Sequence, residues 1–348
     1  NEFELAEQLN VGRGTVREAV KLLVARNVLE IRRGRGTFVA HQTGVVHDPL
    51  GFAYMPDQLR LAHELLDIRL NVEPWVASLA AQQATAEEEE ETSPELNLRK
   101  VYDFALTAPL DEIRFILDTA RLNKAAAEQA FKGNYGHSLG KMLRGTYEHK
   151  VMGDSAFSHI LSYTSAACDA RMAGAMIPVM SNSGSGNQGI SATLPVVVFA
   201  EENGKTEEEL IRALMLSHLT VIYIKQSLGR LSALCGCVVA ATGSSCGITW
   251  LMGGNYNQVA FAVQNMIANL TGMICDGAKP SCALKVTTGV STAVLSAIMA
   301  MEDRCVTSVE GIIDEDVDQS IRNLTRIGSQ AMNETDKMVL DIMTHKGC

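Results

Sequence analysis

The sequence predicts a mainly α-helical protein that consists of a small, basic amino-terminal part and a much larger helical part. Hydrophobic residues make up 47% of the 348 residues but aromatic residues only 5%, and there are 15 Met and 28 Gly. This composition is typical of closely packed helices joined by glycine turns. Apolar residues also recur at intervals of three and four residues along much of the chain. A formal net charge of −10 excludes a protein whose entire surface binds nucleic acid.

The amino-terminal part begins with an expected amphipathic helix over residues 4–9, followed by a turn and a second helix that starts at Arg13. Residues at the amino end of such a second helix contact bases and phosphates. Residues 28–40 predict two short strands joined by a Gly-Arg-Gly tip, the shape of a wing. The predicted DNA-binding residues are Arg13, Thr15, Arg17, Arg33 and Arg35.

Residues 1–45 are therefore predicted to be a winged helix-turn-helix module with DNA as its partner. Residues 1–41 hold seven Lys/Arg and five Asp/Glu, so their charge of 7 − 5 = +2 contrasts with the acidic remainder. The alternative is a solvated helix and hairpin whose arginines only confer solubility. Residues 4–39, ELAEQLNVGRGTVREAVKLLVARNVLEIRRGRGTFV, resemble the FadR-type branch of the GntR regulators. The family's first helix should precede residue 4, so a truncated module is expected.

Residues 46–91 are expected to be the remnant of an effector domain and a linker. Residues 62–86 resemble the first helix of that branch's effector-binding domain, but the rest of its helical bundle does not follow. The acidic run AEEEEETSPELN ends in Ser-Pro, which suits a helix end and a linker. The predicted domains are thus residues 1–45, 46–91 and 92–348.

The composition of the larger part raises the question of a membrane. Residues 231–275 and 172–200 contain no Asp, Glu, Lys, Arg or His, and a spanning helix needs about 20 predominantly apolar residues. Gly, Ser, Thr, Asn and Gln recur throughout both stretches, which favours buried helices of a protein that contacts no membrane. No export signal is present, so we expect a cytoplasmic protein whose eight cysteines are thiols or metal ligands.

Residues 98–106, 110–131 and 140–150 predict helices, and a glycine- and serine-rich loop is expected further along the chain. The loop, SNSGSGNQG, lacks the Gly-Lys-Ser/Thr ending of a phosphate loop, which excludes that kind of nucleotide site. Its polar side chains need partners in apolar surroundings, and a small polar substrate, the backbone or water could supply them. These side chains are Ser183, Ser185, Asn187 and Gln188.

The cysteines offer a candidate metal site. Cys275 and Cys282 would be separated by roughly 10 Å of rise on one helix, but Gly277 and Pro280 favour a loop that turns both sulfurs inward. Cys235 and Cys237 would point to different faces of a helix, so we expect one of the two to join the site. Three thiolates with one open position suit a [4Fe–4S] cluster that binds substrate. Spacing alone favours the alternative, cysteines that only fill the core.

Three long motifs make residues 95–345 similar to the serine dehydratase alpha-chain superfamily, nearest to its L-cysteine desulfidase branch. They are CDARMAGAMIPVMSNSGSGNQGI, LSALCGCVVAATGSSCGITWLMGG and NMIANLTGMICDGAKPSCALKV. The resemblance implies that Cys235, Cys275 and Cys282 hold a [4Fe–4S] cluster whose fourth iron acts as a Lewis acid. It also implies β-elimination from L-serine or L-cysteine, without pyridoxal phosphate, to pyruvate and ammonia. The implied substrate-binding residues are Ser183, Ser185, Asn187 and Gln188, braced by Asp169 and Arg171.

The resemblance leaves the proton-handling residue unassigned. Members of the superfamily carry that cysteine in a Leu-Gly-Cys-Thr-Glu-Pro motif, which residues 1–348 lack. We therefore expect a cluster-dependent amino-acid lyase module, fused to a DNA-binding segment and forming a homo-oligomer. One alternative is a transcriptional regulator with a non-catalytic domain that senses amino acids or iron. Another is an inactive fusion of two truncated genes.

Overall fold

The computed structural model describes residues 6–8, 10–25, 28–32, 36–39, 94–229 and 232–345. The chain divides into two compact units, Asn1–Pro94 and Glu95–Cys348. The protein is mainly α-helical, as predicted, and its described residues form one small two-stranded sheet. Arg33, Arg35 and the predicted effector remnant over residues 46–91 lie outside the described residues.

The first unit contains the helix α2 (Arg13–Ala25) and the antiparallel strands β1 (Leu29–Arg32) and β2 (Gly36–Val39). Val16 of α2 is buried. Leu29 pairs with Val39 and Arg32 with Gly36, so the chain reverses between the strands as a wing does. The helix and hairpin thus follow one another in the predicted order.

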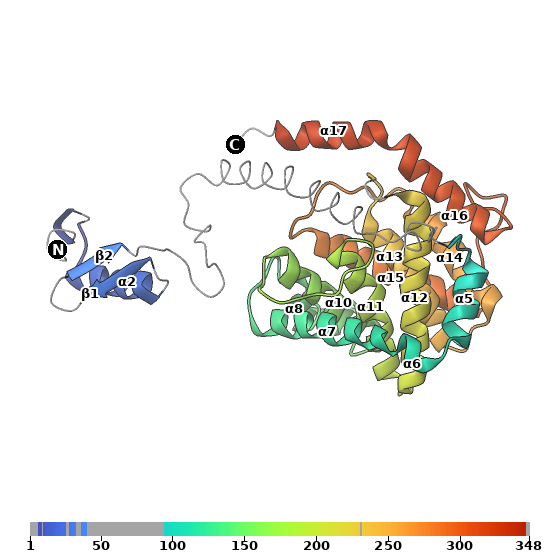
Figure 1. Ribbon diagram of the computed structural model, residues 1–348, viewed down its shortest axis with the longest axis horizontal. Helices are drawn as coiled ribbons and strands as arrows, with labels where there is room; N and C mark the ends of the chain where they lie inside the picture. The colour runs from blue at the N-terminus through green and yellow to red at the C-terminus, as the bar shows by residue number, and fades with distance from the viewer. Residues whose placement is uncertain are drawn as a thin grey trace, which may run out of the picture. The chain divides into compact units, whose positions relative to one another are not determined.

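The second unit is a bundle in which long central helices are covered by shorter ones (Figure 1). Its helices are α5 (Leu98–Thr107), α6 (Leu110–Ile113), η2 (Arg114–Ile116), α7 (Leu117–Lys132), α8 (Leu139–Met142), α9 (Thr146–Val151), α10 (Ala156–Met172), α11 (Gly186–Glu202), α12 (Glu207–Leu228), α13 (Gly236–Leu251), α14 (Tyr256–Leu270), α15 (Cys282–Met301), α16 (Val317–Arg326), η3 (Ile327–Ala331) and α17 (Asn333–Thr344).

The uncharged stretches of the sequence form the centre of this bundle. α13 packs against α11, α12, α14 and α15, and small residues allow a very close approach. A Cβ on Gly243 would lie 2.4 Å from the Ser217 carbonyl oxygen of α12, and a Cβ on Gly247 would lie 2.9 Å from that of Ala213. Only glycine fits where helix backbones approach so closely.

One helix within the described ranges, α15, is long and apolar enough to cross a membrane by length and composition. Half of the relevant window is buried inside the bundle. The other side of α15 exposes Leu284, Leu295 and Ile298. α15 is therefore a core helix of the bundle with one exposed face.

Two predicted helices are interrupted. The helix expected over residues 110–131 is divided by the short 3-10 turn η2 between α6 and α7. The helix expected over residues 140–150 is two helices, because α8 ends in tight turns in which Arg144 and Gly145 donate to carbonyl groups only three residues back. Helical periodicity extends across both breaks and does not reveal them.

Candidate functional site

A tight turn at Asn182–Ser185 starts α11. The backbone N–H groups of Asn182 and Ser185 donate to each other's carbonyl oxygens at 3.1 and 3.0 Å. Ser183 and Gly184 both have positive φ, at 47° and 80°, the pattern of a type I′ turn. Ser185 then caps α11, and its side chain accepts from the Gln188 N–H. Asn187 and Gln188 therefore lie in the first helical turn, and the prediction that they belong to the loop is wrong.

Buried polar side chains form a hydrogen-bond network with Asn182 of this turn. Asn182 donates to His218 Nδ1 at 3.0 Å, and His218 Nε2 lies 2.9 Å from the hydroxyl of Thr193, which donates to the Gly189 carbonyl. His218 therefore carries its proton on Nε2. Burial lowers the pKa of His218 to about 4, so the ring is neutral near pH 7. Asn123 also donates to Thr193 and completes the network.

Arg171 lies across the amino end of α11. A Cβ on Gly186 would lie 2.2 Å from Arg171 Nε, and Arg171 Nη1 donates to Asn187 Oδ1 at 3.1 Å. A guanidinium and the first N–H groups of a helix both favour an anion. The Asp169 side chain does not contact these residues of α11. Its carboxylate instead accepts from the Gly140 N–H of α8 at 2.9 Å. The structure thus brings Arg171, but not Asp169, to the polar residues of α11.

Gln188 connects the start of α11 with the cysteines. Its side chain is buried, its Oε1 has no hydrogen-bond partner, and its Nε2 would lie 2.7 Å from a Cβ on Gly236. Gly236 is the first residue of α13 and stands between Cys235 and Cys237. An unpartnered buried amide oxygen is costly, so it marks a place where a ligand could supply a donor.

The segments that carry the predicted cluster ligands are joined by backbone hydrogen bonds. Leu234 and Ile274 form an isolated bridge, in which the Cys235 N–H donates to Met273 and the Cys275 N–H donates to Ala233. Cys282 is the first residue of α15 and receives a hydrogen bond from the Lys279 N–H at 3.4 Å. Gly277 has a φ of +91°, so the chain turns between Cys275 and Cys282 as expected.

Five thiols share this region, two more than the sequence predicted. Cys237 is hydrogen-bonded to Cys235, because Cys235 precedes α13 and the two side chains do not lie on opposite faces of one helix. Which of the two would bind a metal stays a prediction. Cys168 of α10 lies in the same apolar cluster, and a lone helical cysteine gives no spacing signal. Burial is the main cause of the raised pKa of Cys168 and of Cys275, and the hydrogen bond with Cys235 is the main cause of the raised pKa of Cys237. The neighbouring thiols raise all three pKa values further.

Two lysines lie near the thiols. Lys285 donates to the Ile274 carbonyl at 2.8 Å and forms an ion pair with Asp276, which also pairs with Lys279. These lysines lower the pKa of Asp276 to about 2. The amino ends of α13 and α15 point toward the same region. A negatively charged thiolate-bound group would be stabilised here.

The donor set fits an iron–sulfur cluster. Within residues 94–229 and 232–345, no group of three or more His, Cys, Asp or Glu side chains is arranged to hold a metal ion. The thiolates of a four-iron cluster each bind a different iron, so they stand further apart than the ligands of one ion. Soft thiol donors on two bridged segments, with lysines and helix amino ends nearby, match the needs of such a cluster.

The predicted DNA-binding residues of the first unit are placed in part. Arg13, Thr15 and Arg17 lie in the first turn or so of α2, and all three are exposed. Arg33 and Arg35 lie in the part of the chain that the structure does not describe.

Comparison with known families agrees with both resemblances seen in the sequence. The family described as "Serine dehydratase alpha chain" matches residues 75–341, and "Bacterial regulatory proteins, gntR family" matches residues 1–39. The larger match begins at residue 75 and so includes the end of residues 62–86, which resemble an effector-domain helix of the regulators.

Several bacterial proteins are similar to the larger unit. A UPF0597 protein of Bacteroides thetaiotaomicron is 96% identical over 269 residues, which are 77% of this chain and 63% of that protein. A UPF0597 protein of Porphyromonas gingivalis is 60% identical over 76% of this chain and 61% of its own length. The UPF0597 protein YhaM of Salmonella newport is 47% identical over 76% of this chain and 62% of its own length. The chain spans less than two thirds of these relatives, whose names state no activity.

Proposed function

Because the chain belongs to the serine dehydratase alpha chain family over residues 75–341, we propose that its larger unit is a cytoplasmic, iron–sulfur-dependent amino-acid lyase. The reaction removes the β-substituent of L-serine or L-cysteine. One observation carries the proposal: Gln188, at the amino end of α11, packs against Gly236 between two thiols. A polar, anion-favouring face and a thiol cluster therefore share one site.

The chain's own residues would bind and orient the amino acid. Arg171 and the first N–H groups of α11 favour the α-carboxylate, and the unpartnered Oε1 of Gln188 can accept from the ammonium group. Cys235, Cys275 and Cys282 would hold the [4Fe–4S] cluster, which supplies a Lewis-acidic iron when bound. Burial of Cys235 and Gln188 excludes water from that side of the site.

The reaction balances without an external oxidant or reductant. L-Serine loses its α-proton and β-hydroxide, together one water, and leaves aminoacrylate. Aminoacrylate tautomerises to an imine, which takes up one water and releases pyruvate and ammonia. L-Cysteine follows the same course with hydrogen sulfide as the first product.

Reconstitution tests this proposal. Anaerobic incubation of the purified chain with iron and sulfide should give a brown protein, and Cys235→Ala, Cys275→Ala and Cys282→Ala should each remove the colour. Cys305→Ala is a matched control, because Cys305 lies near Gln264 and outside the thiol cluster. A colourless wild type, or a brown Cys275→Ala/Cys282→Ala double variant, overturns the cluster. Pyruvate release from L-serine and L-cysteine then tests the reaction itself.

The first unit supports a second function, DNA binding. The observation that favours it is α2 followed by the antiparallel β1–β2 hairpin, with arginines at the amino end of α2. Arg17→Ala should weaken retardation of promoter fragments in a gel, and more strongly at low salt. Unchanged mobility of every fragment at low salt contradicts this function.

Self-association is also part of the proposal. The open face of α15 exposes Leu284, Leu295 and Ile298 at 53%, 55% and 49% of their surface, which supports a contact with a second copy. The molar mass from light scattering should correspond to a multimer. A monomeric mass at micromolar concentration contradicts it.

A further inference from the structure

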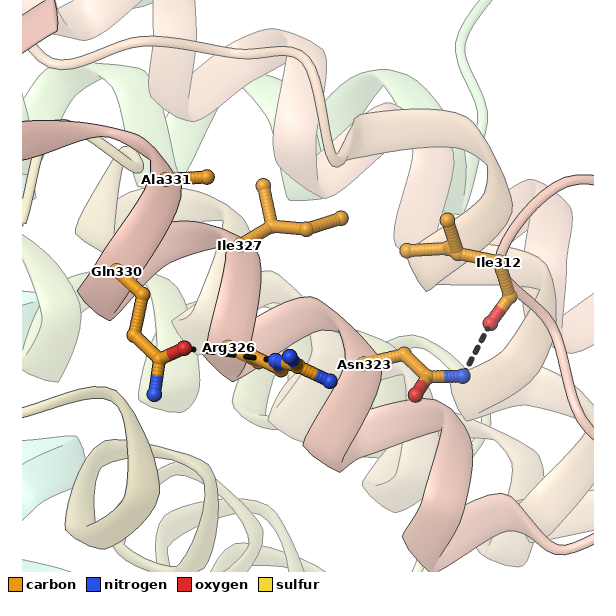
Figure 2. Close-up of a pocket in the computed structure, with 6 residues that line it drawn as sticks. All are labelled: Ile312, Asn323, Arg326, Ile327, Gln330 and Ala331. Carbon is orange, nitrogen blue, oxygen red and sulfur yellow. Dashed lines mark hydrogen bonds between the residues drawn. The ribbon is translucent and has the colours of Figure 1, made fainter.

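A surface cavity that is open to solvent lies between α16, η3 and the segment that precedes α16, and Arg326, Gln330 and Ala331 are exposed at it. Its volume is about 510 Å³, within the range of small-molecule sites. Figure 2 shows polar side chains along one wall and aliphatic side chains along the other. The lining residues are Ile312, Asn323, Arg326, Ile327, Gln330 and Ala331.

The polar wall offers one positive charge and no acidic side chain. Arg326 Nε lies 3.4 Å from Gln330 Oε1, and Arg326 has no carboxylate partner among the residues that the structure describes. Asn323 is held in place by its hydrogen bond to the Ile312 carbonyl at 2.9 Å. In a chain of net charge −10, a guanidinium that has no carboxylate partner among the described residues and lies beside an apolar wall suits a small carboxylate with an apolar side group.

The backbone at this cavity is unusual. Ile327–Ala331 is a turn of π-helix, closed by the hydrogen bond from Met332 N–H to the Ile327 carbonyl. π-turns inside helices are frequent at functional sites. The Gly328 carbonyl, which belongs to this turn, accepts from the Ser232 hydroxyl at 2.7 Å.

The same turn is connected to the thiol cluster by direct contacts. A Cβ on Gly328 would lie 2.4 Å from Leu228 Cδ1, so the π-turn touches the segment that leads to Cys235. Ser232 accepts from the Leu234 N–H at 3.1 Å, and Leu234 forms the bridge with Ile274. An unbroken series of contacts thus joins the π-turn to the segments that carry the two cysteines next to that bridge.

We propose that the cavity lined by Arg326, Ile327 and Gln330 is a regulatory site for a small carboxylate with an apolar side group. The carboxylate pairs with the Arg326 guanidinium, and the apolar group lies against Ile312, Ile327 and Ala331. Occupancy shifts the π-turn and changes the accessibility of Cys235 through Gly328, Ser232 and Leu234. This site is separate from the proposed substrate site, and its binding test requires neither cluster nor turnover.

Binding is tested with 3-phenylpropanoate as the probe and purified cluster-free chain in isothermal titration. We expect the carboxylate to bind, and 3-phenylpropan-1-ol and 3-phenylpropylammonium not to bind. Arg326→Gln should weaken binding about tenfold or more, the effect of losing one charged hydrogen-bonded pair. Arg322→Gln is the matched control, because Arg322 is on the same helix but pairs with Asp316. Absence of heat with wild type, or equal binding by Arg326→Gln, overturns the site.

Coupling is tested by alkylation with iodoacetamide and mass spectrometry of each cysteine. The probe should change the alkylation rate of Cys235 more than twofold and leave Cys305 unchanged. Gly328→Ala should abolish the effect or destabilise the bundle, so Ser232→Ala, which removes only the hydroxyl contact, serves as the second variant. Binding without any change at Cys235 overturns the regulatory part of the proposal.

Discussion

The amide of Gln188 packs against the backbone of Gly236, where a Cβ would lie 2.7 Å from Nε2. Gln188 belongs to the first turn of α11 and Gly236 to the first turn of α13, so two helices begin at one place. Gly236 leaves room for the glutamine because it has no side chain. The contact joins the polar residues of α11 to the thiols.

Gly236→Ala should displace the Gln188 amide. The atoms in the way belong to a flexible side chain, so we expect a small loss of stability, about 1 kcal/mol, measured by urea unfolding. Reconstituted protein should lose at least tenfold in pyruvate formation at low substrate concentration, because the amide no longer faces the substrate.

A double-variant cycle separates displacement from general damage. In a Gln188→Ala background the new methyl group meets no amide, so Gly236→Ala should cause little further loss of activity. Independent, additive losses from the two substitutions would show that the contact between Gln188 and Gly236 is unimportant.

Gly189→Ala should destabilise the larger unit strongly. A Cβ there would lie 1.9 Å from the Met180 carbonyl oxygen, and backbone cannot move away as a side chain can. We expect a loss of about 3 kcal/mol in the free energy of unfolding. Gly272→Ala, where a Cβ meets nothing within 4 Å, is the control and should change stability by less than about 0.5 kcal/mol. Equal stability of both variants contradicts the close approach.

His218 should make the fold less stable in mild acid. Its folded pKa of about 4 lies below the usual value of 6.5, so the unfolded chain binds the proton more tightly. The contribution is present above pH 6.5 and is lost as the pH falls toward 4, by about 2 kcal/mol between pH 7 and pH 5. His218→Gln should be less stable at pH 7 yet show a smaller change between these pH values in urea unfolding. An unchanged pH dependence in the variant contradicts the prediction.

His159 should have the opposite pH dependence. Its ring nitrogens lie 2.7 Å from Asp154 and from Glu202, and the hydrogen bond that the ring donates to Glu202 is the main cause of its raised pKa. Its contribution is therefore complete below pH 6.5 and is lost as the pH rises through the raised folded pKa. The side chains of His159, Asp154 and Glu202 are partly exposed, so the contribution of His159 to the free energy of unfolding is small, about 0.5 kcal/mol. Titration of the His159 ring by NMR checks the direction of the shift, and a midpoint below 6.5 contradicts it.

Local signals predicted much of the fold. Apolar spacing and a glycine-containing tip between strands predicted α2 and the hairpin in the correct order. Gly277 and Pro280 predicted the turn before α15. The breaks at η2 and after α8 were not predictable in this way, because tertiary packing bends a chain whose periodicity continues.

The candidate site was predictable residue by residue but not as an arrangement. Ser185 and Gln188 form the Ser-x-x-Gln pattern of a capping box, a signal that could have placed Asn187 and Gln188 in a helix. The Gln188 side chain does not complete the box but turns toward Gly236. Cys168 and His218 reach the region only through packing between helices, which spacing along the chain does not report. Lys285 follows Cys282 by three residues on α15, so helical spacing could have placed it near that thiol.

The bridge between Leu234 and Ile274 fastens the two ends of the α13–α14 hairpin to each other. The spacing of Cys235 and Cys275 is thus set where the hairpin closes, not at its far end near Gly253. Insertions at that distant turn add little chain entropy to an already closed loop. Residues can therefore be inserted at the distant turn, or that turn replaced, while the distance between the Cys235 and Cys275 sulfurs stays the same.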